Sequence, residues 1–550
     1  MKRFWLVLLS LGLVLAFSAS AMAVDVKFSG SFYAAGMYLD KTSFNKDAQT
    51  GLLSAINTTM AGSIEAPSIA YAQTVNINPA GTPAVYMTLP QATAYVAAHS
   101  EGRFDGVNFH HFDGVQKPGV STAFYYQRLR VKTDFIVSPG LKLVTRFDAM
   151  ERIWGGVRGN ATQTGFLSPT AQTIGSQSAG TREENQNIAF DWAYIDYVSP
   201  IGLFQVGYME DNGYGTVFGN NALNGTPVGA ISYTVPIGPF YINAKIAKLA
   251  DNSSNAIAPS SATDQDIDSY SVCAIFVPTK DIQIGLLGGY QRIASGRADF
   301  YMNTRYNPYP LPQAFEAHAY SVNPYVKAKF GPIAVEAEVN YAFGKASWEN
   351  GATGLPMAGI TDNVDVQNLT VYANAVADFG MFYGGATFAY VSGDDPTTPN
   401  KMEGGFINGG VDFQPCLIMF NSDRAYWAGN LNGYGTAYSG AFVGSLGPAP
   451  DSGVLANAWF YQGKVGVRPI APLDIMASVS YAQADQKPTD VLNSAYGWEV
   501  DVTATYKITN NLSYMLGAAY LFTGDYYKGD SLGNRINDNY MLINKLTLTF

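Results

Sequence analysis

Residues 498–507 read WEVDVTATYK, and their strict alternation decides the fold class. Side chains of an extended strand point alternately to its two faces. One face of this segment carries the apolar side chains Trp498, Val500, Val502, Ala504 and Tyr506. The other face carries the polar side chains Glu499, Asp501, Thr503, Thr505 and Lys507. A lipid-facing Arg or Lys near the middle of a bilayer costs about 2–4 kcal/mol, so the pattern predicts one face toward lipid and one toward a wet lumen.

The same alternation recurs along the chain. In residues 126–135 one face carries Tyr126, Arg128, Arg130, Lys132 and Asp134. In residues 333–341 the apolar face is opposed by Ala334, Glu336, Glu338 and Asn340. Aromatic residues lie toward the expected strand ends, as in interfacial girdles, for example Tyr197, Phe204, Phe330 and Phe379.

Short turns punctuate these segments. Pro presets φ for a turn, and Gly or Asn tolerates positive φ, so each short motif has a physical reason to reverse the chain. The expected turns lie at 138–140, 199–202, 236–239, 278–281, 330–332, 378–380, 471–472 and 509–511. Eight tight turns join sixteen strands. Two further strands, 25–39 and 537–550, must pair to close the sheet, which predicts an all-β, antiparallel up-and-down barrel of about eighteen strands.

Longer polar stretches connect the other strand ends. They lie near 41–120, 156–185, 212–224, 251–266, 295–316, 347–363, 393–452, 485–494 and 525–536. Short turns at one end and long loops at the other are the asymmetry of outer-membrane barrels, so we expect the short turns and both termini to be periplasmic and the long loops to be external. The loops 41–120 and 393–452 are too long for simple connectors. We expect one or both to fold into or over the lumen, or to contact another protomer in a trimer.

The N-terminus reads as an export signal. Lys2 and Arg3 precede an apolar run at 4–17, and Ala21-Met22-Ala23 supplies small residues for signal-peptide cleavage after Ala23. The run is shorter than the roughly 20 residues that a membrane-spanning helix needs. We therefore expect a signal peptide at 1–23, an outer-membrane barrel at 24–550 and localisation in the outer membrane.

Composition narrows the function classes. The chain carries 33 Lys and Arg against 43 Asp and Glu, and removal of Lys2 and Arg3 changes the net charge from −10 to −12. A chain this acidic has no overall basic field for nucleic acid. Charged residues make up only 14%, against about 25% in ordinary soluble domains. Neither Cys273 nor Cys416 has a CxxC partner. The sequence leaves two alternatives, a disulfide between them or two free thiols.

The sequence contains few residues or motifs of the kinds that catalyse reactions or bind metal ions. The four histidines are His99, His110, His111 and His318, and none has the spaced partners of a metal site. No GxSxG elbow, P-loop, HExxH or EF-hand loop occurs. We therefore expect no enzyme activity, no catalytic or metal-binding residue and no cofactor.

Charges on the polar strand faces are the candidate pore-lining residues. The basic candidates are Arg128, Arg130, Lys132, Lys142, Arg146, Arg152, Lys327 and Lys329. The acidic candidates are Glu336, Glu338, Glu499 and Asp501. A basic wall facing an acidic wall would set up a transverse field across the lumen. Two roles are open for Arg128, Arg130 and Arg146: they line a selective constriction, or they brace the wall through pairs with carboxylates such as Asp134 and Asp148.

Three stretches carry a family resemblance. They are FYYQRLRVKTDF at 124–135, FDWAYIDYVSPIGLFQVGYMEDNGYGTVFG at 190–219 and the last strand NYMLINKLTLTF, which ends in Phe550. With the expected signal peptide, they resemble Gram-negative outer-membrane porins of the eighteen-strand type, in particular delta-proteobacterial porins and the alginate-export-like class. The clustered basic residues and the opposing acids depart from the strongly Arg-lined lumen expected of alginate exporters.

The resemblance implies a channel. An eighteen-stranded barrel is wide enough for a water-filled lumen, and the expected function is passive diffusion of small hydrophilic solutes or ions across the outer membrane. The alternative is a structural or docking barrel that sheathes an electron-transfer or secretion partner. The expected partners are outer-membrane lipid and the barrel-assembly machinery, which would recognise the strand ending at Phe550, with a possible homotrimer.

Overall fold

The structure is a computed structural model of the chain. It describes residues 24–46, 121–155, 188–251, 266–294, 315–348, 363–434, 453–529 and 531–550, apart from positions 42, 212, 396, 399–400, 430, 432 and 488–490. The expected signal peptide, most of the 41–120 loop with three of the four histidines, and residues 435–452 lie outside these ranges.

The described residues form strands along almost the whole chain, and their bounds follow in chain order. The first ten are β1 (Asp25–Leu39), β2 (Thr122–Ser138), β3 (Leu141–Ile153), β4 (Ala189–Ser199), β5 (Gly202–Glu210), β6 (Pro227–Ile237), β7 (Phe240–Ala250), β8 (Ile267–Thr279), β9 (Ile282–Ile293) and β10 (Phe315–Phe330). The others are β11 (Ile333–Trp348), β12 (Asn363–Asp378), β13 (Phe382–Val391), β14 (Lys401–Met402), β15 (Ala458–Ile470), β16 (Leu473–Gln483), β17 (Ala495–Lys507), β18 (Leu512–Thr523) and β19 (Asn539–Thr549). Two short helices are α5 (Ser422–Ala428) and the 3-10 helix η4 (Asp525–Lys528).

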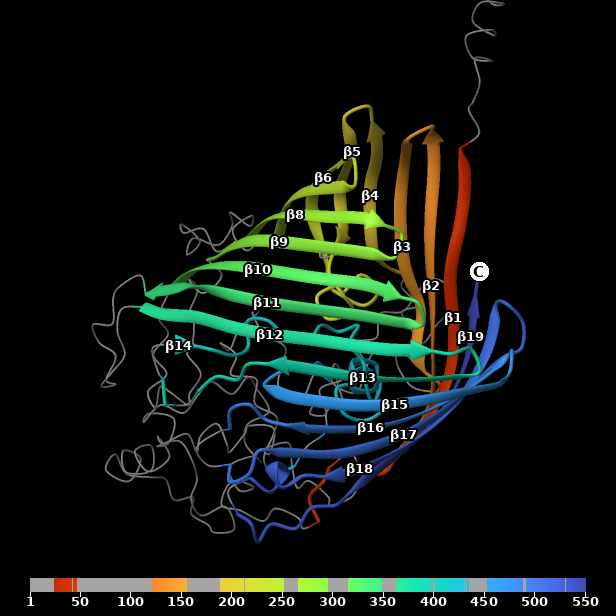
Figure 1. Cartoon of the computed structure of the whole chain (residues 1–550), viewed down its shortest axis with the longest axis vertical. Helices are drawn as coiled ribbons and strands as arrows, with labels where there is room; N and C mark the ends of the chain where they lie inside the picture. The colour runs from red at the N-terminus through yellow and green to blue at the C-terminus, as the bar shows by residue number, and fades with distance from the viewer. Residues whose placement is uncertain are drawn as a thin grey trace, which may run out of the picture.

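Eighteen of these strands form one closed antiparallel barrel. Each strand pairs with its neighbours in sequence, and β1 also pairs with β19 to close the ring, as Figure 1 shows for β1 in red beside β19 in blue. The exception is the two-residue β14, which pairs in parallel with β12 inside a long connection, so that β13 pairs directly with β15. The predicted architecture, strand number and closing pair are confirmed.

All eight predicted turns lie where two strands meet. Gly140, Gly238, Gly331 and Gly380 adopt positive φ at four of them, a conformation that glycine enters without a Cβ clash. The opposite strand ends open into the longer connections. The predicted asymmetry between short turns and long loops is therefore confirmed.

The outer surface of the barrel is apolar. On β17 the side chains of Trp498, Val500 and Val502 are exposed, whereas Glu499 and Asp501 between them are buried. Exposed apolar and aromatic side chains recur at alternate positions on the other strands. A closed sheet satisfies all backbone hydrogen bonds within itself, and an apolar exterior matches a lipid surrounding. The molecule is a barrel of the outer-membrane type.

A large buried cluster lies within the ring. It combines inward side chains of the wall, such as Tyr33 and Phe460, with residues of the connection between β14 and β15, such as Ile418 and Trp427. Both cysteines are buried free thiols. No helix in the described part of the chain is long and apolar enough to span a bilayer.

Candidate pore constriction

The connection between β5 and β6, residues 211–226, folds into the barrel over its described part. The backbone N–H and the hydroxyl of Thr216 both donate hydrogen bonds of 2.6 Å to the Glu338 carboxylate of β11. Phe218 stacks on Tyr372 of β12, with ring centroids 5.3 Å apart. Four strands separate β6 from β11 in the sheet, so these contacts carry the connection across part of the lumen.

The connection between β14 and β15 also folds inward. The backbone N–H groups of Ile418 and Met419 donate hydrogen bonds of 2.6 and 2.7 Å to the two oxygens of Glu499 on β17. Cys416 and Ile418 are buried in the cluster within the ring. The prediction that the 393–452 loop folds into the lumen therefore holds for its described part, and burial of its apolar run is the driving force.

Helix α5 carries this second connection to the wall at β1 and β19. The Asn421 side chain caps the helix. Trp427 donates a hydrogen bond of 3.2 Å to the Tyr33 hydroxyl of β1. Asp423 lies 3.6 Å from the ammonium group of Lys545 on β19, which in turn lies over the Tyr33 ring. The helix is thus fixed to the wall at several points.

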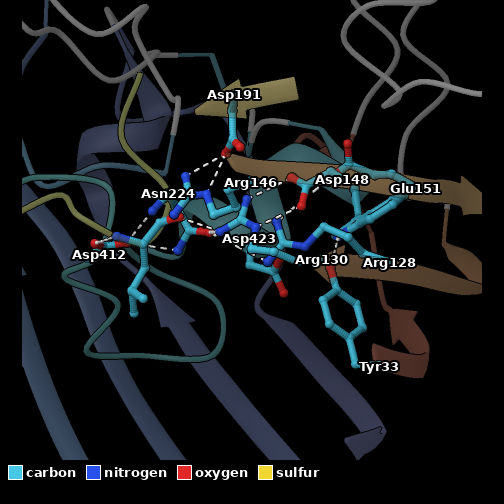
Figure 2. Close-up of polar contacts among 12 residues, drawn as sticks. Tyr33, Arg128, Arg130, Arg146, Asp148, Glu151, Asp191, Asn224, Asp412 and Asp423 are labelled. Carbon is cyan, nitrogen blue, oxygen red and sulfur yellow. Dashed lines mark hydrogen bonds and ion pairs between the residues drawn. The ribbon is translucent and has the colours of Figure 1, made fainter. Parts of the chain in front are cut away.

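Beside this helix the wall presents two of the predicted arginines, Arg128 and Arg130 on β2 (Figure 2). The Arg130 guanidinium makes two hydrogen bonds of 2.7 Å to the Asp148 carboxylate on β3, a bidentate pair that fixes its plane. Arg128 lies 3.7 Å from Glu151 and over the Tyr33 ring. Both arginines keep a minor exposed fraction, so they border accessible space.

The third arginine, Arg146 on β3, is more deeply enclosed. Its guanidinium pairs with Asp191 at 2.5 Å and lies 3.6 Å from the centre of the Trp192 ring. A further N–H donates a hydrogen bond of 3.0 Å to the carbonyl of Ala222 in the β5–β6 connection. Arg146 therefore holds an inward loop against the wall.

The two inward connections meet beside these arginines, at Asn224 and Asp412 (Figure 2). The Asp412 carboxylate accepts hydrogen bonds from the backbone N–H groups of Leu223 and Asn224, at 2.9 and 3.1 Å, and from the Asn224 side chain at 2.8 Å. Arg130 donates to the Leu223 carbonyl from the opposite side. These contacts join β2, β3 and the two loops into one cluster of paired positive and negative groups, which is the candidate constriction.

Lys132 and Lys142 extend the basic row toward the short turns. Both approach one carboxylate, Asp134, at 3.5 and 3.1 Å. With the Arg130–Asp148 pair, these contacts match the wall-bracing role that the sequence left open.

Arg152 departs from the prediction. It lies opposite Gln127, on the face of the hairpin that points away from Arg128, because the register shifts between Gln127 and Leu129. Met150 has a φ of 53° there, which marks a β-bulge in β3. The extra residue reverses the expected alternation, so Arg152 is placed on the outward face and Glu151 on the inward face.

Lys327, Lys329 and Glu336 share the inward face near the short-turn end. Lys327 lies directly opposite Glu336 in the β10–β11 pair. These residues are on the predicted face but far along the wall from the arginines, which belong to β2 and β3. They do not take part in the constriction described above.

Three predicted acidic residues point inward but are covered. Glu338, Glu499 and Asp501 are at most 3% exposed, because the two inward connections pack over them. Ser478 donates a hydrogen bond of 3.2 Å to Asp501. Cys416, Glu499 and Asp501 bring possible metal ligands within 4.8 Å of one another, but both Glu499 oxygens already accept backbone N–H groups. The cluster is explained as the anchor of the loop, and the acidic wall does not face open water at these positions.

On the other side of the β5–β6 connection the lumen holds a polar cavity of about 270 Å³. Its wall is formed mainly by hydroxyl and amide side chains, among them Ser269, Ser271, Gln291, Asn323 and Asn340, with Lys245 at one edge. Such a lining suits hydrated solutes.

Sequence reasoning missed the residues that complete the candidate constriction, namely Asp191 on β4, Leu223, Asn224 and Asp412 in the two connections, and Asp423 on α5. Asp191 lies at a register shift in the β3–β4 pair, so simple alternation along 190–197 would have placed it on the outward face with Ile195. Leu223, Asn224 and Asp412 lie in irregular loops and Asp423 in a two-turn helix, where no strand periodicity indicates which side chain meets which strand.

No protein-family model and no curated protein sequence matches the chain. Among solved structures, the chain is similar to a BenF-like porin from Pseudomonas fluorescens Pf-5, with 9% identity, a TM-score of 0.45, and coverage of 96% of this chain and 99% of that one. It is also similar to Pseudomonas aeruginosa OpdK with vanillate, with 11% identity, a TM-score of 0.42, and coverage of 96% and 99%. Pseudomonas aeruginosa OccK9 (OpdG) gives 12% identity, a TM-score of 0.43, and coverage of 95% and 99%. At these values the function must be argued from the residues of this chain.

Proposed function

We propose that this protein is a porin-type, non-enzymatic channel for passive diffusion of small hydrophilic solutes or ions across the outer membrane. The observation that carries the proposal is an eighteen-stranded barrel whose lumen is narrowed by two inward loops, with partly accessible arginines on one side of a loop and a polar cavity on the other. A barrel of this width holds water unless it is filled.

The charge pattern favours weak ion selectivity. Arg128, Arg130 and Arg146 each have a carboxylate partner, so the constriction is close to neutral. Paired groups of opposite sign orient a passing dipole without trapping a charged solute. We therefore propose hydrophilic solutes without a strong net charge as the main cargo.

Planar-bilayer recordings in a salt gradient test both the channel and its lining. In the double variant Arg128→Ala with Arg130→Ala, Glu151 and Asp148 lose their partners. If the arginines line the pore, the reversal potential shifts toward cation selectivity, with a permeability ratio changed roughly twofold or more. The matched control is Arg152→Ala, which removes an arginine from the same hairpin on the outward face.

An unchanged reversal potential in the double variant, with the control also unchanged, would remove these arginines from the pore lining. The alternative function is a structural or docking barrel around a partner, and the packed cluster within the ring favours it. That alternative predicts that the folded wild-type protein gives no conductance steps above the bare bilayer.

The remaining partner assignments stay predictions from the sequence. We propose that the apolar exterior contacts outer-membrane lipid and that the C-terminal strand ending at Phe550 is recognised by the assembly machinery. A homotrimer is a further prediction, which cross-linking in the native membrane would test.

A further inference from the structure

One row of outward residues crosses six neighbouring strands near the long-loop end of the barrel. The pairing register places these residues side by side in the order Lys248 (β7), Asp268 (β8), Arg292 (β9), His318 (β10), Lys345 (β11) and Asp365 (β12). We call this set the charged row. Each of its members belongs to a cross-strand pair, and such side chains point to the same face of the sheet.

The next outward row toward the short turns is aromatic at four of its six positions. In the same strand order it contains Ile246, Tyr270, Tyr290, Tyr320, Phe343 and Gln367. Tyr290 and Tyr320 have ring centroids 5.1 Å apart, and Tyr320 stacks on Phe343 at 5.6 Å. The row after that is apolar, with Val272, Val322 and Tyr341 among its exposed members. Charged, aromatic and apolar rows in succession mark the boundary between water, lipid headgroups and acyl chains.

The charged row is accessible from outside the barrel. The side chain of Lys345 is 65% exposed and that of His318 is 45% exposed. Ile246, Tyr270, Tyr320 and other members of the row below are exposed as well, which shows that this face is the outer surface. The row therefore stands where the barrel meets the outer leaflet, given the membrane placement proposed above.

Neighbouring carboxylates hold the basic side chains in place. Lys248 contacts Asp266 and Asp268 at 2.7 and 2.6 Å, and Arg292 contacts Glu316 at 2.6 Å. Lys345, by contrast, is 3.9 Å from Asp365 and largely exposed. Within the row, Arg292, His318 and Lys345 are three consecutive residues of basic type. Glu316, outside the row, contacts Arg292 and lies 3.7 Å from His318, which leaves Lys345 as the most accessible cation of the three.

The other side of the barrel differs at the same level. There the girdle tyrosines donate hydrogen bonds to acids above them: Tyr38 to Asp40, Tyr390 to Asp485 and Tyr520 to Asp538. The two sides thus differ in the residues that contact the girdle tyrosines or stand above them. These are Arg292, His318 and Lys345 over β9–β11, and the acids Asp40, Asp485 and Asp538 over the β13–β1 side, where Asp40 also pairs with Lys41. The asymmetry indicates a side-specific interaction rather than a general property of the rim.

We propose that the Arg292–His318–Lys345 segment binds phosphate groups on lipid headgroups of the outer leaflet. Adjacent strands are about 4.8 Å apart, so the segment extends over roughly 10 Å, the scale of a phosphorylated sugar headgroup. A guanidinium can bind phosphate through two parallel N–H donors, and an ammonium adds a point charge. The aromatic row below packs against the start of the acyl chains.

Native mass spectrometry of the detergent-purified protein tests the proposal. The probe is lipid A with two phosphate monoesters, compared with the same glycolipid lacking both phosphates. We expect tighter binding of the phosphorylated form, and in Arg292→Gln with Lys345→Gln a loss of affinity on the order of tenfold. The matched control is Lys280→Gln with Lys507→Gln, which removes two exposed lysines from the short-turn rim.

Equal affinity for the two glycolipids, or an equal loss in the control, would overturn the proposal. Lys345→Gln alone keeps the experiment decisive if the double variant does not fold, because Lys345 is largely exposed and makes only a 3.9 Å pair. We expect a smaller but measurable loss for that variant. The readout is independent of conductance, so a failed channel proposal and a failed lipid proposal give different results.

Discussion

At the scale of single residues, each arginine of the candidate constriction is paired with a carboxylate. The Arg130 guanidinium and the Asp148 carboxylate form a bidentate pair with limited exposure, and removal of one partner from such a pair leaves an uncompensated charge. The sequence placed both side chains on one face and left pairing open as one of two roles. It could not show that Asp412 and Asn224 would join them, because those residues are distant in the chain and lie in irregular loops.

Asp148→Asn tests the electrostatic part of this arrangement. The substitution keeps the shape of the side chain but removes its negative charge. The positive charge of Arg130 is then left without a counter-charge beside the proposed pore. We expect the reversal potential in a potassium chloride gradient to move toward anion selectivity, with a permeability ratio changed roughly twofold. Asp474→Asn is the control, because Asp474 pairs with Arg468 near the short-turn rim, away from the constriction. A shift of equal size in the control would contradict the assignment of the constriction to Arg130.

At the scale of elements, the decisive event is the inward folding of two loops. The apolar run at 416–420 indicated that this segment must be buried away from water. The alternating polar residues of β17 indicated that Glu499 points inward. The contact between Glu499 and this segment could not be predicted. Its donors are backbone N–H groups of the loop, which every non-proline residue has whatever its side chain. The same limit explains why Glu338 and Glu499 were expected to face water but are buried as loop anchors.

Labelling of Cys416 reports on this anchor. Burial raises the pKa of the Cys416 thiol, and the thiol is enclosed, so reaction with a maleimide requires the loop to open. In a Cys273→Ser background, Glu499→Gln replaces one acceptor oxygen by a donor that faces a backbone N–H. We expect Cys416 to label roughly tenfold faster, since an unsatisfied buried polar group costs about 1–3 kcal/mol. Thr505→Ala, on the same face of β17 but farther along the strand, should leave the rate unchanged. A rate equal to that of the parent would mean that Glu499 does not hold the loop.

At the scale of the whole molecule, the barrel was predictable because its signals are local and repeated. Proline, glycine and asparagine at the short turns, and strict alternation between them, specify each hairpin without long-range information. Closure could be predicted because the eight hairpins leave one unpaired strand at each end of the chain, and these two strands must pair with each other. Register shifts could not be predicted. The bulge near Met150 reverses the face on which Arg152 lies, and no residue pattern in the local sequence indicates a bulge there.

The seam between β1 and β19 offers a sharp test of closure. Gly30 and Phe550 exchange both backbone hydrogen bonds, so the adjacent pair, Ser31 and Thr549, is a non-hydrogen-bonded pair with close Cα atoms. Such pairs suit a disulfide. In a background without Cys273 and Cys416, we expect Ser31→Cys with Thr549→Cys to oxidise readily. Non-reducing electrophoresis should then show a covalently closed chain that keeps a compact mobility after heating in detergent.

The control for the seam moves one cysteine by two residues along β19. Thr547 lies opposite Tyr33 rather than Ser31, so Ser31→Cys with Thr547→Cys places the thiols in a diagonal relation. We expect that variant to oxidise slowly and to unfold to the mobility of the linear chain on heating. Efficient bonding at the diagonal pair, with little at Ser31 and Thr549, would show that the seam has a different register. Because every strand is paired through its neighbours, a shift at this seam would also move the inward face of β19, and with it the contact between Lys545 and Asp423 that fixes helix α5.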